Sequence, residues 1–509
     1  MLDSVKKRGM KVNVRKTKLM VFARSESTTE CGILIEGQKV EKVKDFVYQD
    51  SLFTNDGKHD RDIERRHKGG AEYDPYCDPD NPIKVEYEEV LAASRRMAGA
   101  VVRTPCPLSH LSEKLNMDLY MKQEFLQYTG SFKERGVRNT MLLLDDLQRR
   151  KGVVAASTGN HAQAMSYHTT DMGIPCAVVM PETSPITKIS KCERYGAKTI
   201  LHGQTLAEAK RFAMSLANEK GMIYVNGYDH PHVVAGQGTA GIEIVQDVPD
   251  VDAVLIPIGG GSLVCGVAIA VKHLKPDAEI YGLGTEKCHS MMDAVKQKER
   301  IFLTIDCSLA DGLAVNKVGV NTFFSIMCGG LVDKMVQVKE EWVARAIMHI
   351  VESERIVVEG SAAVGVAAIM AGLLPNLKGK KVVTILTGGN IDTTILSRAL
   401  ERGMAAEGRL VKFKVTVTDR PGGMAELCSR LADIGVCIKD CIPERAWVKA
   451  DVFSVQMKVL CETKGWDHTN KLVDTIKRHY KEYTFTENIQ DKSSKRGPCL
   501  ARNPVCMRK

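Results

Sequence analysis

The chain of 509 residues lacks the features that mark secreted and membrane proteins. No run approaches the roughly 18 consecutive apolar residues of a membrane span. The 15 cysteines include no Cys-x-x-Cys pair and no zinc-type spacing with histidine, which argues against a disulfide framework or a zinc module. The first residues also lack the apolar stretch of a secretory signal. We therefore expect a reduced, cytoplasmic protein with no membrane partner.

A concentrated block of one charge is missing as well. The net charge is +9, and basic residues gather only modestly in the first 70 and the last 20 positions. Such a pattern is a weak argument for binding nucleic acid, and we expect no such partner. The length exceeds the roughly 250 to 300 residues at which single cores stop growing, so more than one domain is expected.

Residues 1–70 differ in character from the rest of the chain. The segment 11–66, with KTKLMVF, ILIEGQKVEKVKDFVY and FTNDGKHDRDIERR, resembles the tail of a retrotransposon reverse transcriptase. The paired-aspartate catalytic box of that polymerase is absent, so the resemblance implies no polymerase activity. Two interpretations stay open for residues 1–70: a fused fragment or gene-model artefact, and a regulatory or nucleic-acid-binding extension.

From about Asp78, short apolar runs alternate with amphipathic segments. This order is typical of a parallel sheet covered by helices, so we expect an α/β fold. The predicted strands are 152–157, 176–180, 253–258, 280–284 and 382–386, and the predicted helices include 160–172, 186–195 and 263–273.

Lys133 lies in the motif SFKERG, at the start of a predicted helix. The positive end of the helix dipole and burial both disfavour an ammonium there, so a neutral amine that can form a Schiff base is expected. A lone lysine in this setting would be read as an exposed helix residue. Whether Lys133 is a Schiff-base lysine or an exposed helix residue therefore depends on the other motifs in the chain.

Two of these motifs follow predicted strands. STGNHAQ covers residues 157–163, and GGGSL covers residues 259–263. Such turns lie at the carboxyl ends of parallel strands, where ligands bind. The glycine loop can bring backbone N–H groups close to a phosphate at a helix N-terminus. Taken alone, it could also be a plain tight turn.

The motifs SFKERG, STGNHAQ, AGQGT, GGGS and TGGNID occur in an order that resembles fold-type II pyridoxal-phosphate enzymes, specifically threonine dehydratases and serine racemases, over residues 78–403. The resemblance implies two open parallel-type sheets with helices on both faces, in a catalytic domain 78–405 with a small subdomain 152–229. It implies pyridoxal 5'-phosphate as cofactor, Lys133 as Schiff-base lysine and catalytic residue, and Asn160 as partner of the ring hydroxyl. The implied phosphate cradle is Gly259, Gly260, Gly261 and Ser262, the hydroxyl facing the ring nitrogen is that of Thr387, and the substrate-binding residues are Ser157, Thr158, Gly159 and His161.

The function that follows is β-elimination from L-threonine or L-serine, giving 2-oxobutanoate or pyruvate and ammonia. Lys133 would remove the α-proton. Racemisation is the alternative, because Thr158 stands where racemases carry a serine hydroxyl and dehydratases usually carry alanine. Tyr228 favours the dehydratase, since racemases tend to have asparagine there. An alternative of another class is a catalytically silent amino-acid sensor.

A cation site is a further implication of the resemblance. Glu286 matches the first ligand of the family's divalent cation site. Met292 stands where the later acidic ligand is expected, and Asp293 is one residue off. A divalent or monovalent cation and an ordinary surface glutamate both remain open.

The segment 410–485 forms a different unit. Met424, Leu427, Leu431 and Ile434 recur at helical spacing, and alternating apolar residues at 453–459 predict a strand with one wet face. With TDRPGG at its first turn, the unit resembles an ACT domain, a βαββαβ amino-acid-sensing module. The resemblance implies an amino-acid effector near Asp419, Gly422 and Gly423, and a homodimer or homotetramer; an ordinary turn is the alternative. Residues 486–509 are polar and aperiodic, which predicts disorder.

Overall fold

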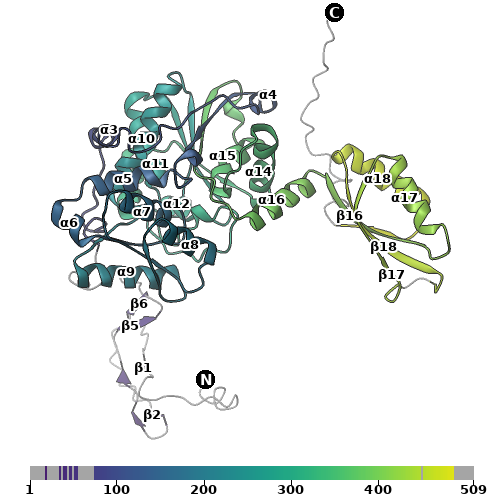
Figure 1. The fold of residues 1–509 in the computed structure, drawn as a ribbon, viewed down its shortest axis with the longest axis horizontal. Coiled ribbons are helices and arrows are strands. Elements are labelled where there is room, and N and C mark those ends of the chain that lie inside the picture. The colour runs from purple at the N-terminus through teal and green to yellow at the C-terminus, as the bar shows by residue number, and fades with distance from the viewer. Residues whose placement is uncertain are drawn as a thin grey trace, which may run out of the picture. The chain divides into compact units, whose positions relative to one another are not determined.

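The computed structural model describes residues 74–448 and 451–486, together with the backbone of six short strands between residues 18 and 54 (Figure 1). The chain separates into the units 1–75 and 76–509. In the first unit the strands form three two-stranded pairs, β1 with β4, β2 with β3 and β5 with β6. Their bounds are Lys18–Leu19, Leu34–Ile35, Gln38–Lys39, Glu41–Lys42, Asp45–Tyr48 and Ser51–Thr54. The tail predicted to be disordered lies, from residue 487, outside the described residues.

The larger sheet of the second unit has five parallel strands in the order β14-β13-β12-β15-β7. Alternate residues of β12 enter two separate cores: Val254 packs in one and Leu255 in the other. Apolar side chains are therefore buried on both faces, as expected of a parallel sheet with helices on each side. The strands are β7 Asp118–Gln123, β12 Ala253–Pro257, β13 Glu279–Thr285, β14 Lys334–Val338 and β15 Lys381–Leu386. The helices of this part are α3 Tyr87–Arg96, α4 Ser112–Leu115, α10 Pro231–Asp247, α11 Ser262–Leu274, α12 Ser290–Gln297, α13 Val320–Gly329, α14 Glu340–Glu354, α15 Gly360–Met370 and α16 Thr393–Ala406, with 3-10 turns Glu124–Leu126, Asp311–Leu313 and Pro375–Leu377.

A second parallel sheet, in the order β10-β9-β8-β11, is built from the chain between β7 and β12. Its strands are β8 Val153–Ala156, β9 Cys176–Met180, β10 Lys198–Leu201 and β11 Ile223–Tyr224. The helices here are α5 Lys133–Leu142, α6 Asp146–Lys151, α7 Asn160–Asp171, α8 Ile186–Arg194 and α9 Leu206–Lys220. The predicted α/β fold with two open parallel sheets is confirmed, and the predicted strand and helix ends lie within two residues of those observed.

The carboxy-terminal module is an antiparallel sheet, β17-β18-β16-β19, with two helices. Its elements are β16 Leu410–Thr418, α17 Gly423–Asp433, β17 Cys437–Glu444, β18 Ser454–Glu462, α18 Trp466–His479 and β19 Tyr483–Phe485. Val455, Met457 and Val459 are buried as predicted. Two details of the prediction are wrong: Phe453 precedes the strand and is 63% exposed, and Met424 is 39% exposed at the first turn of α17, where it faces away from the core.

Helix α16 continues through Ala406 and packs against α14, with Gly403 close to Ala344 and Met348. Among the described residues, no helix combines the length and the apolar character needed to cross a bilayer.

Candidate active site

Lys133 is the first residue of α5, as the sequence predicted. Its Nζ atom donates to the carbonyl oxygen of Gly227 at 2.5 Å. Burial of the amine lowers its pKa to about 8, although the carboxylate of Glu359 acts in the opposite direction. The neutral amine, which is the form that reacts with a carbonyl group, is therefore far more populated near neutral pH than in an ordinary lysine.

The motifs come from two sheets. STGNHAQ follows β8 of the smaller sheet, whereas the glycine loop follows β12 of the larger one. SFKERG does not follow a strand directly, because a 3-10 turn and a loop separate β7 from α5. The site thus lies where the carboxyl ends of two sheets meet. Hydrogen bonds between loops and helix starts that follow strands of different sheets, rather than one sheet edge, bring its residues together.

Backbone hydrogen bonds join the residues that precede Lys133 to the TGGNID motif. Phe132 N–H donates to the carbonyl oxygen of Thr387 at 3.0 Å, and Ser131 forms a β-bridge with Gly388. The start of α5 and the end of β15 are therefore held in register. This places the Thr387 hydroxyl in the same neighbourhood as Lys133.

Glu359 connects the predicted cofactor residues. Asn160 Nδ2 donates to Glu359 Oε2 at 2.9 Å, and the Thr387 hydroxyl donates to Glu359 Oε1 at 3.3 Å. A third donor is the Ser361 hydroxyl, at 2.6 Å. Glu359 is 4% exposed, and burial raises its pKa above the ordinary value, although these three donors oppose the change.

The glycine loop has no room for side chains. A Cβ atom at Gly260 would lie 2.3 Å from Tyr228 Cγ, and one at Gly261 would lie 2.6 Å from Thr322 Cβ. Gly261 has a φ of 111° and is the N-cap of α11, a conformation that glycine adopts without strain. Backbone N–H groups at this helix start can therefore approach an anion closely, as predicted.

Unpaired polar atoms are a second sign of a ligand site. Ser131 Oγ and His161 Nδ1 are buried and have no hydrogen-bond partner in the described part of the chain. His161 Nε2 lies 3.1 Å from the carbonyl oxygen of Val225, so Nε2 carries the proton and Nδ1 is a free acceptor. Burial, with a smaller contribution from the charge of Lys133, lowers the pKa of His161 to about 3. Buried polar atoms are normally paired, so this arrangement fits a polar ligand.

The substrate-binding residues predicted from STGNHAQ lie at the start of α7. Gly159 is the N-cap of this helix, and its N–H donates to Ser157 Oγ at 3.3 Å. Ser157, Thr158 and Gly159 are half-buried, while His161 is buried. A carboxylate placed here would meet the positive end of the helix dipole.

Three contributors to the site were not predicted from the sequence: Glu359, the carbonyl of Gly227, and Asn390. Asn390 Nδ2 donates to Asn160 Oδ1 at 2.9 Å and to the carbonyl of Thr129 at 2.7 Å. An acidic residue between the apolar Val358 and a run of small residues was a visible signal for Glu359. No signal in the sequence marked Gly227, because it contributes only its backbone.

A buried ion network supports the helix that carries Lys133. Arg135 makes two hydrogen bonds of 2.8 Å to Glu124 and two, of 2.7 and 2.8 Å, to Glu243, which also pairs with Lys122 at 2.6 Å. Burial alone would raise the pKa of Glu124, but Arg135, together with Thr104 and Lys122, more than offsets this and holds the pKa below the ordinary value. The charges satisfy one another, so the network orients α5.

The predicted cation ligand Glu286 is exposed and accepts from the N–H of Glu340 at 3.1 Å. Asp293 lies instead beside His289, with 2.9 Å between Oδ2 and Nδ1. Within the described ranges, no three metal-ligating side chains come together as a site. The binding of a cation at Glu286 therefore stays a prediction, because the described residues do not form a cation site around it.

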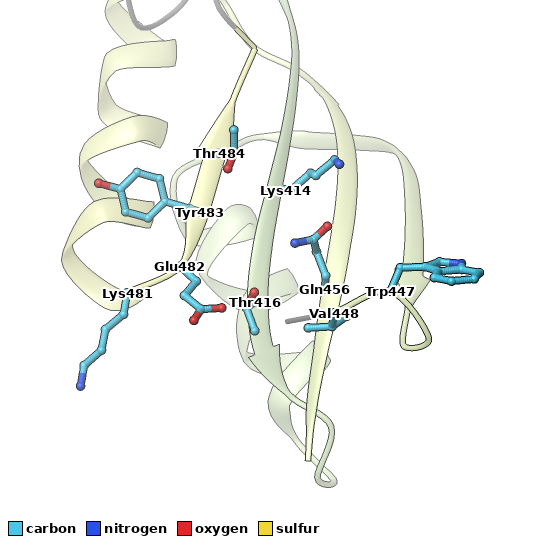
Figure 2. Close-up of a pocket in the computed structure, with 9 residues that line it drawn as sticks. All are labelled: Lys414, Thr416, Trp447, Val448, Gln456, Lys481, Glu482, Tyr483 and Thr484. Atoms are coloured by element: carbon cyan, nitrogen blue, oxygen red, sulfur yellow. The ribbon is translucent and has the colours of Figure 1, made fainter. Parts of the chain in front are cut away.

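In the carboxy-terminal module, Asp419 pairs with Arg445 through two hydrogen bonds of 2.7 and 2.8 Å, and Gly422 is the N-cap of α17 with a φ of 101°. A Cβ at Gly423 would lie 2.1 Å from the carbonyl oxygen of Thr418. A shallow pocket of about 470 Å³ lies on the sheet of this module. Figure 2 shows its lining, with Lys414, Thr416 and Gln456 on neighbouring strands and Trp447 at the rim.

Comparison with known proteins agrees with this geometry. Residues 97–388 match the family described as pyridoxal-phosphate dependent enzyme, and the chain belongs to it. The cofactor of this family is pyridoxal phosphate, and the residues present fit it: a lysine with a lowered pKa, a glycine cradle that a Cβ would fill, and buried polar atoms without partners.

Individual relatives show which members of this family the chain is similar to. The chain is 38% identical to an L-threonine ammonia-lyase of Thermotoga maritima over 389 residues, covering 76% of this chain and 96% of that protein. It is 36% identical to a catabolic L-threonine dehydratase of Escherichia coli, covering 62% of this chain and 96% of that protein. Among solved structures it resembles a threonine deaminase from Solanum lycopersicum (33% identity, TM-score 0.59, covering 63% and 95%) and maize serine racemase (28%, 0.59, covering 64% and 99%).

Proposed function

We propose that this protein is a pyridoxal-phosphate-dependent lyase that converts L-threonine, or L-serine, into the keto acid and ammonia. The observation that carries the proposal is the Lys133 amine, held beside Gly227 with its pKa lowered to about 8. It is supported by the similarity to proteins named L-threonine ammonia-lyase and L-threonine dehydratase.

The cofactor would be held at three places. Lys133 would bind its carbonyl carbon, and the N–H groups of residues 259–262 would bind its phosphate. Asn160 and Thr387 would contact the ring, Asn160 at the hydroxyl and Thr387 at the nitrogen. When bound, pyridoxal phosphate supplies an electron sink for the charge that develops at the substrate α-carbon.

Residues of this chain bind the substrate and move its proton. The start of α7, at Ser157 to His161, binds the substrate carboxylate and fixes the orientation of the α-carbon. Once the substrate amine has displaced it from the cofactor, Lys133 is again a neutral amine and removes the α-proton. That proton balances the one the β-hydroxyl needs to leave as water, and the enamine released from the site loses ammonia by hydrolysis. The neutral Thr387 hydroxyl would leave the ring nitrogen largely unprotonated, which favours prompt elimination.

Serine racemisation is a second candidate activity, because Thr158 offers a hydroxyl at the start of α7. A racemase needs such a second acid/base on the opposite face of the substrate. Tyr228, which packs against Gly260, supports the lyase instead, since racemases tend to carry asparagine at this position. A silent sensor with the same fold would keep the cofactor and release neither product.

The carboxy-terminal module supports a regulatory proposal. Its antiparallel sheet and two helices are compatible with an ACT-like domain, and we assign residues 410–485 to it. The turn at Asp419, Gly422 and Gly423 would bind a free amino acid, and paired modules would make a homodimer or homotetramer. We place the protein in the cytoplasm. For residues 1–70 we keep the resemblance to a reverse-transcriptase fragment, without a catalytic role.

The deciding experiment measures keto-acid formation from L-threonine and L-serine, with D-serine assayed in the same samples. Lys133→Ala is expected to lower kcat by at least a thousandfold, because the α-proton then has no base. Lys220→Ala, an exposed lysine at the end of α9, is the matched control and should keep full activity. D-serine as the main product would favour racemisation. Bound cofactor without either product would favour the sensor.

A further inference from the structure

Asp229 is a buried carboxylate outside the predicted catalytic set. It is 2% exposed and lies between β11 and α10. Oδ2 accepts from Val320 N–H at 2.7 Å, and Oδ1 accepts from Thr322 N–H at 3.1 Å. Asp229 therefore caps the start of α13, where the helix dipole stabilises a negative charge. Across the described residues it forms no ion pair with a lysine, arginine or histidine.

Thr322 connects the helix start held by Asp229 to the glycine loop. Its hydroxyl donates to the carbonyl oxygen of Gly260 at 2.7 Å, and the N–H of Gly319 approaches the same oxygen at 3.4 Å. The packing is tight, since a Cβ at Gly319 would lie 2.1 Å from Asp229 Oδ1. Thr322 and Gly319 therefore cannot shift without moving Asp229.

The carbonyl of Gly260 and the N–H of Gly261 belong to one planar peptide unit. In a trans peptide the two bonds point in opposite directions, so fixing the oxygen also fixes the direction of the N–H. Glycine peptides rotate easily, because no Cβ restricts φ and ψ. A loop of three successive glycines therefore needs a restraint from outside if its donors are to stay aligned.

We propose that Asp229 is the positioning residue of the phosphate cradle, acting through Thr322 on the Gly260–Gly261 peptide. It touches neither substrate nor cofactor. It holds α13 so that the Thr322 hydroxyl keeps the Gly261 N–H turned toward the phosphate. The inference rests on the proposed role of residues 259–262 in binding the phosphate of pyridoxal phosphate.

The test compares two probes on the full-length chain after removal and re-addition of cofactor: pyridoxal 5'-phosphate, and pyridoxal, which has no phosphate. Asp229→Asn keeps the shape but turns an amide donor toward a backbone N–H. We expect roughly tenfold weaker binding of pyridoxal 5'-phosphate, the order expected when a buried hydrogen bond is lost, and unchanged binding of pyridoxal. Asp145→Asn, the same change at the N-cap of α6, is the control and should alter neither constant.

A second pair of variants keeps the test decisive if Asp229→Asn does not fold. Thr322→Val removes the hydroxyl at constant shape and should weaken only the phosphate-bearing probe, while Thr322→Ser should restore binding. The double variant Asp229→Asn/Thr322→Val should bind pyridoxal 5'-phosphate about as tightly as whichever single variant binds it less tightly, because both substitutions act through one peptide. Equal weakening of both probes, or of neither, overturns the proposal. Failure of the wild-type chain to deaminate threonine would instead count against the proposed function, since these binding constants do not depend on turnover.

Discussion

Asn160 donates a hydrogen bond from Nδ2 to Oε2 of Glu359, at 2.9 Å, across 199 positions of sequence. Because Thr387 and Ser361 donate to the other oxygen, one buried carboxylate is shared by residues from three segments. The charge of Glu359 also reaches Lys133, whose pKa it raises against the lowering caused by burial. A residue that the sequence motifs did not include therefore moderates the effect of burial on the acid–base state of the lysine.

Glu359→Gln should lower the pKa of the Lys133 amine further, because only burial then acts on it. The measurement is the pH dependence of Lys133 modification by an amine-reactive reagent in the cofactor-free chain, read by mass spectrometry. Glu354→Gln, on α14, is the control, since its carboxylate accepts from Ser109 Oγ instead. An unchanged titration of Lys133 would show that Glu359 does not govern it.

Thr158 should separate elimination from racemisation. Thr158→Ala removes the hydroxyl proposed to act on the second face and is expected to abolish any D-serine formation while keeping most keto-acid production. Thr158→Ser supplies a less hindered hydroxyl and should raise D-serine several-fold. Chiral chromatography of serine after incubation checks both outcomes. Equal D-serine from the two variants would remove Thr158 from consideration as an acid/base.

Arg135→Met should destabilise the chain by about 3–5 kcal/mol, because it leaves Glu124 buried without its partner. Arg138→Met, on the same helix, removes an ion pair to the half-exposed Asp171 and should cost only about 0–1 kcal/mol. Denaturant unfolding of the two variants beside the wild type gives the comparison. Similar losses from both would mean that the buried network contributes no more than a surface pair.

Stability should fall as the pH is lowered from about 6.5 toward 4.5. Burial lowers the pKa of His161 and of His230 to about 3, whereas unfolded histidine titrates near 6.5. Below 6.5 the unfolded chain binds more protons than the native one, so each histidine contributes a slope of about 1.4 kcal/mol per pH unit, with no contribution above 6.5. His161→Gln should reduce the slope by one proton, and the exposed control His110→Gln should leave it unchanged. A slope that His161→Gln does not alter would contradict this assignment.

The ion pair between Asp419 and Arg445 should control the response to amino acids. Arg445→Ala frees the Asp419 carboxylate at the proposed effector turn, and we expect its repulsion to weaken a carboxylate-bearing effector by roughly fivefold. Arg430→Ala breaks another solvent-exposed pair, with Glu426 on α17, and serves as control. Activity titrations with free amino acids give the apparent constants. Equal responses of the two variants would place the effector elsewhere.

The sequence alone determined the parts that depend on local pattern. The period of apolar residues predicted β12 and α11 almost to their ends, and five motifs predicted the family and the lysine at the start of α5. Alternation identified β18, but Phe453 was wrongly included, because alternation alone does not show where pairing with β16 stops. These features depend on residues that are close together in the sequence, so their spacing can be read from the sequence directly.

Only the tertiary structure decided the relationships between distant segments. The partnership of Glu359 with Asn160, the acceptor carbonyl of Gly227 and the route from Asp229 through Thr322 to Gly260 join segments 62 to 199 positions apart. Such contacts depend on how two sheets meet, and a backbone carbonyl carries no sequence signature. The environment that lowers the pKa of Lys133 is set in the same way, because burial and the nearby carboxylate exist only once the chain has folded.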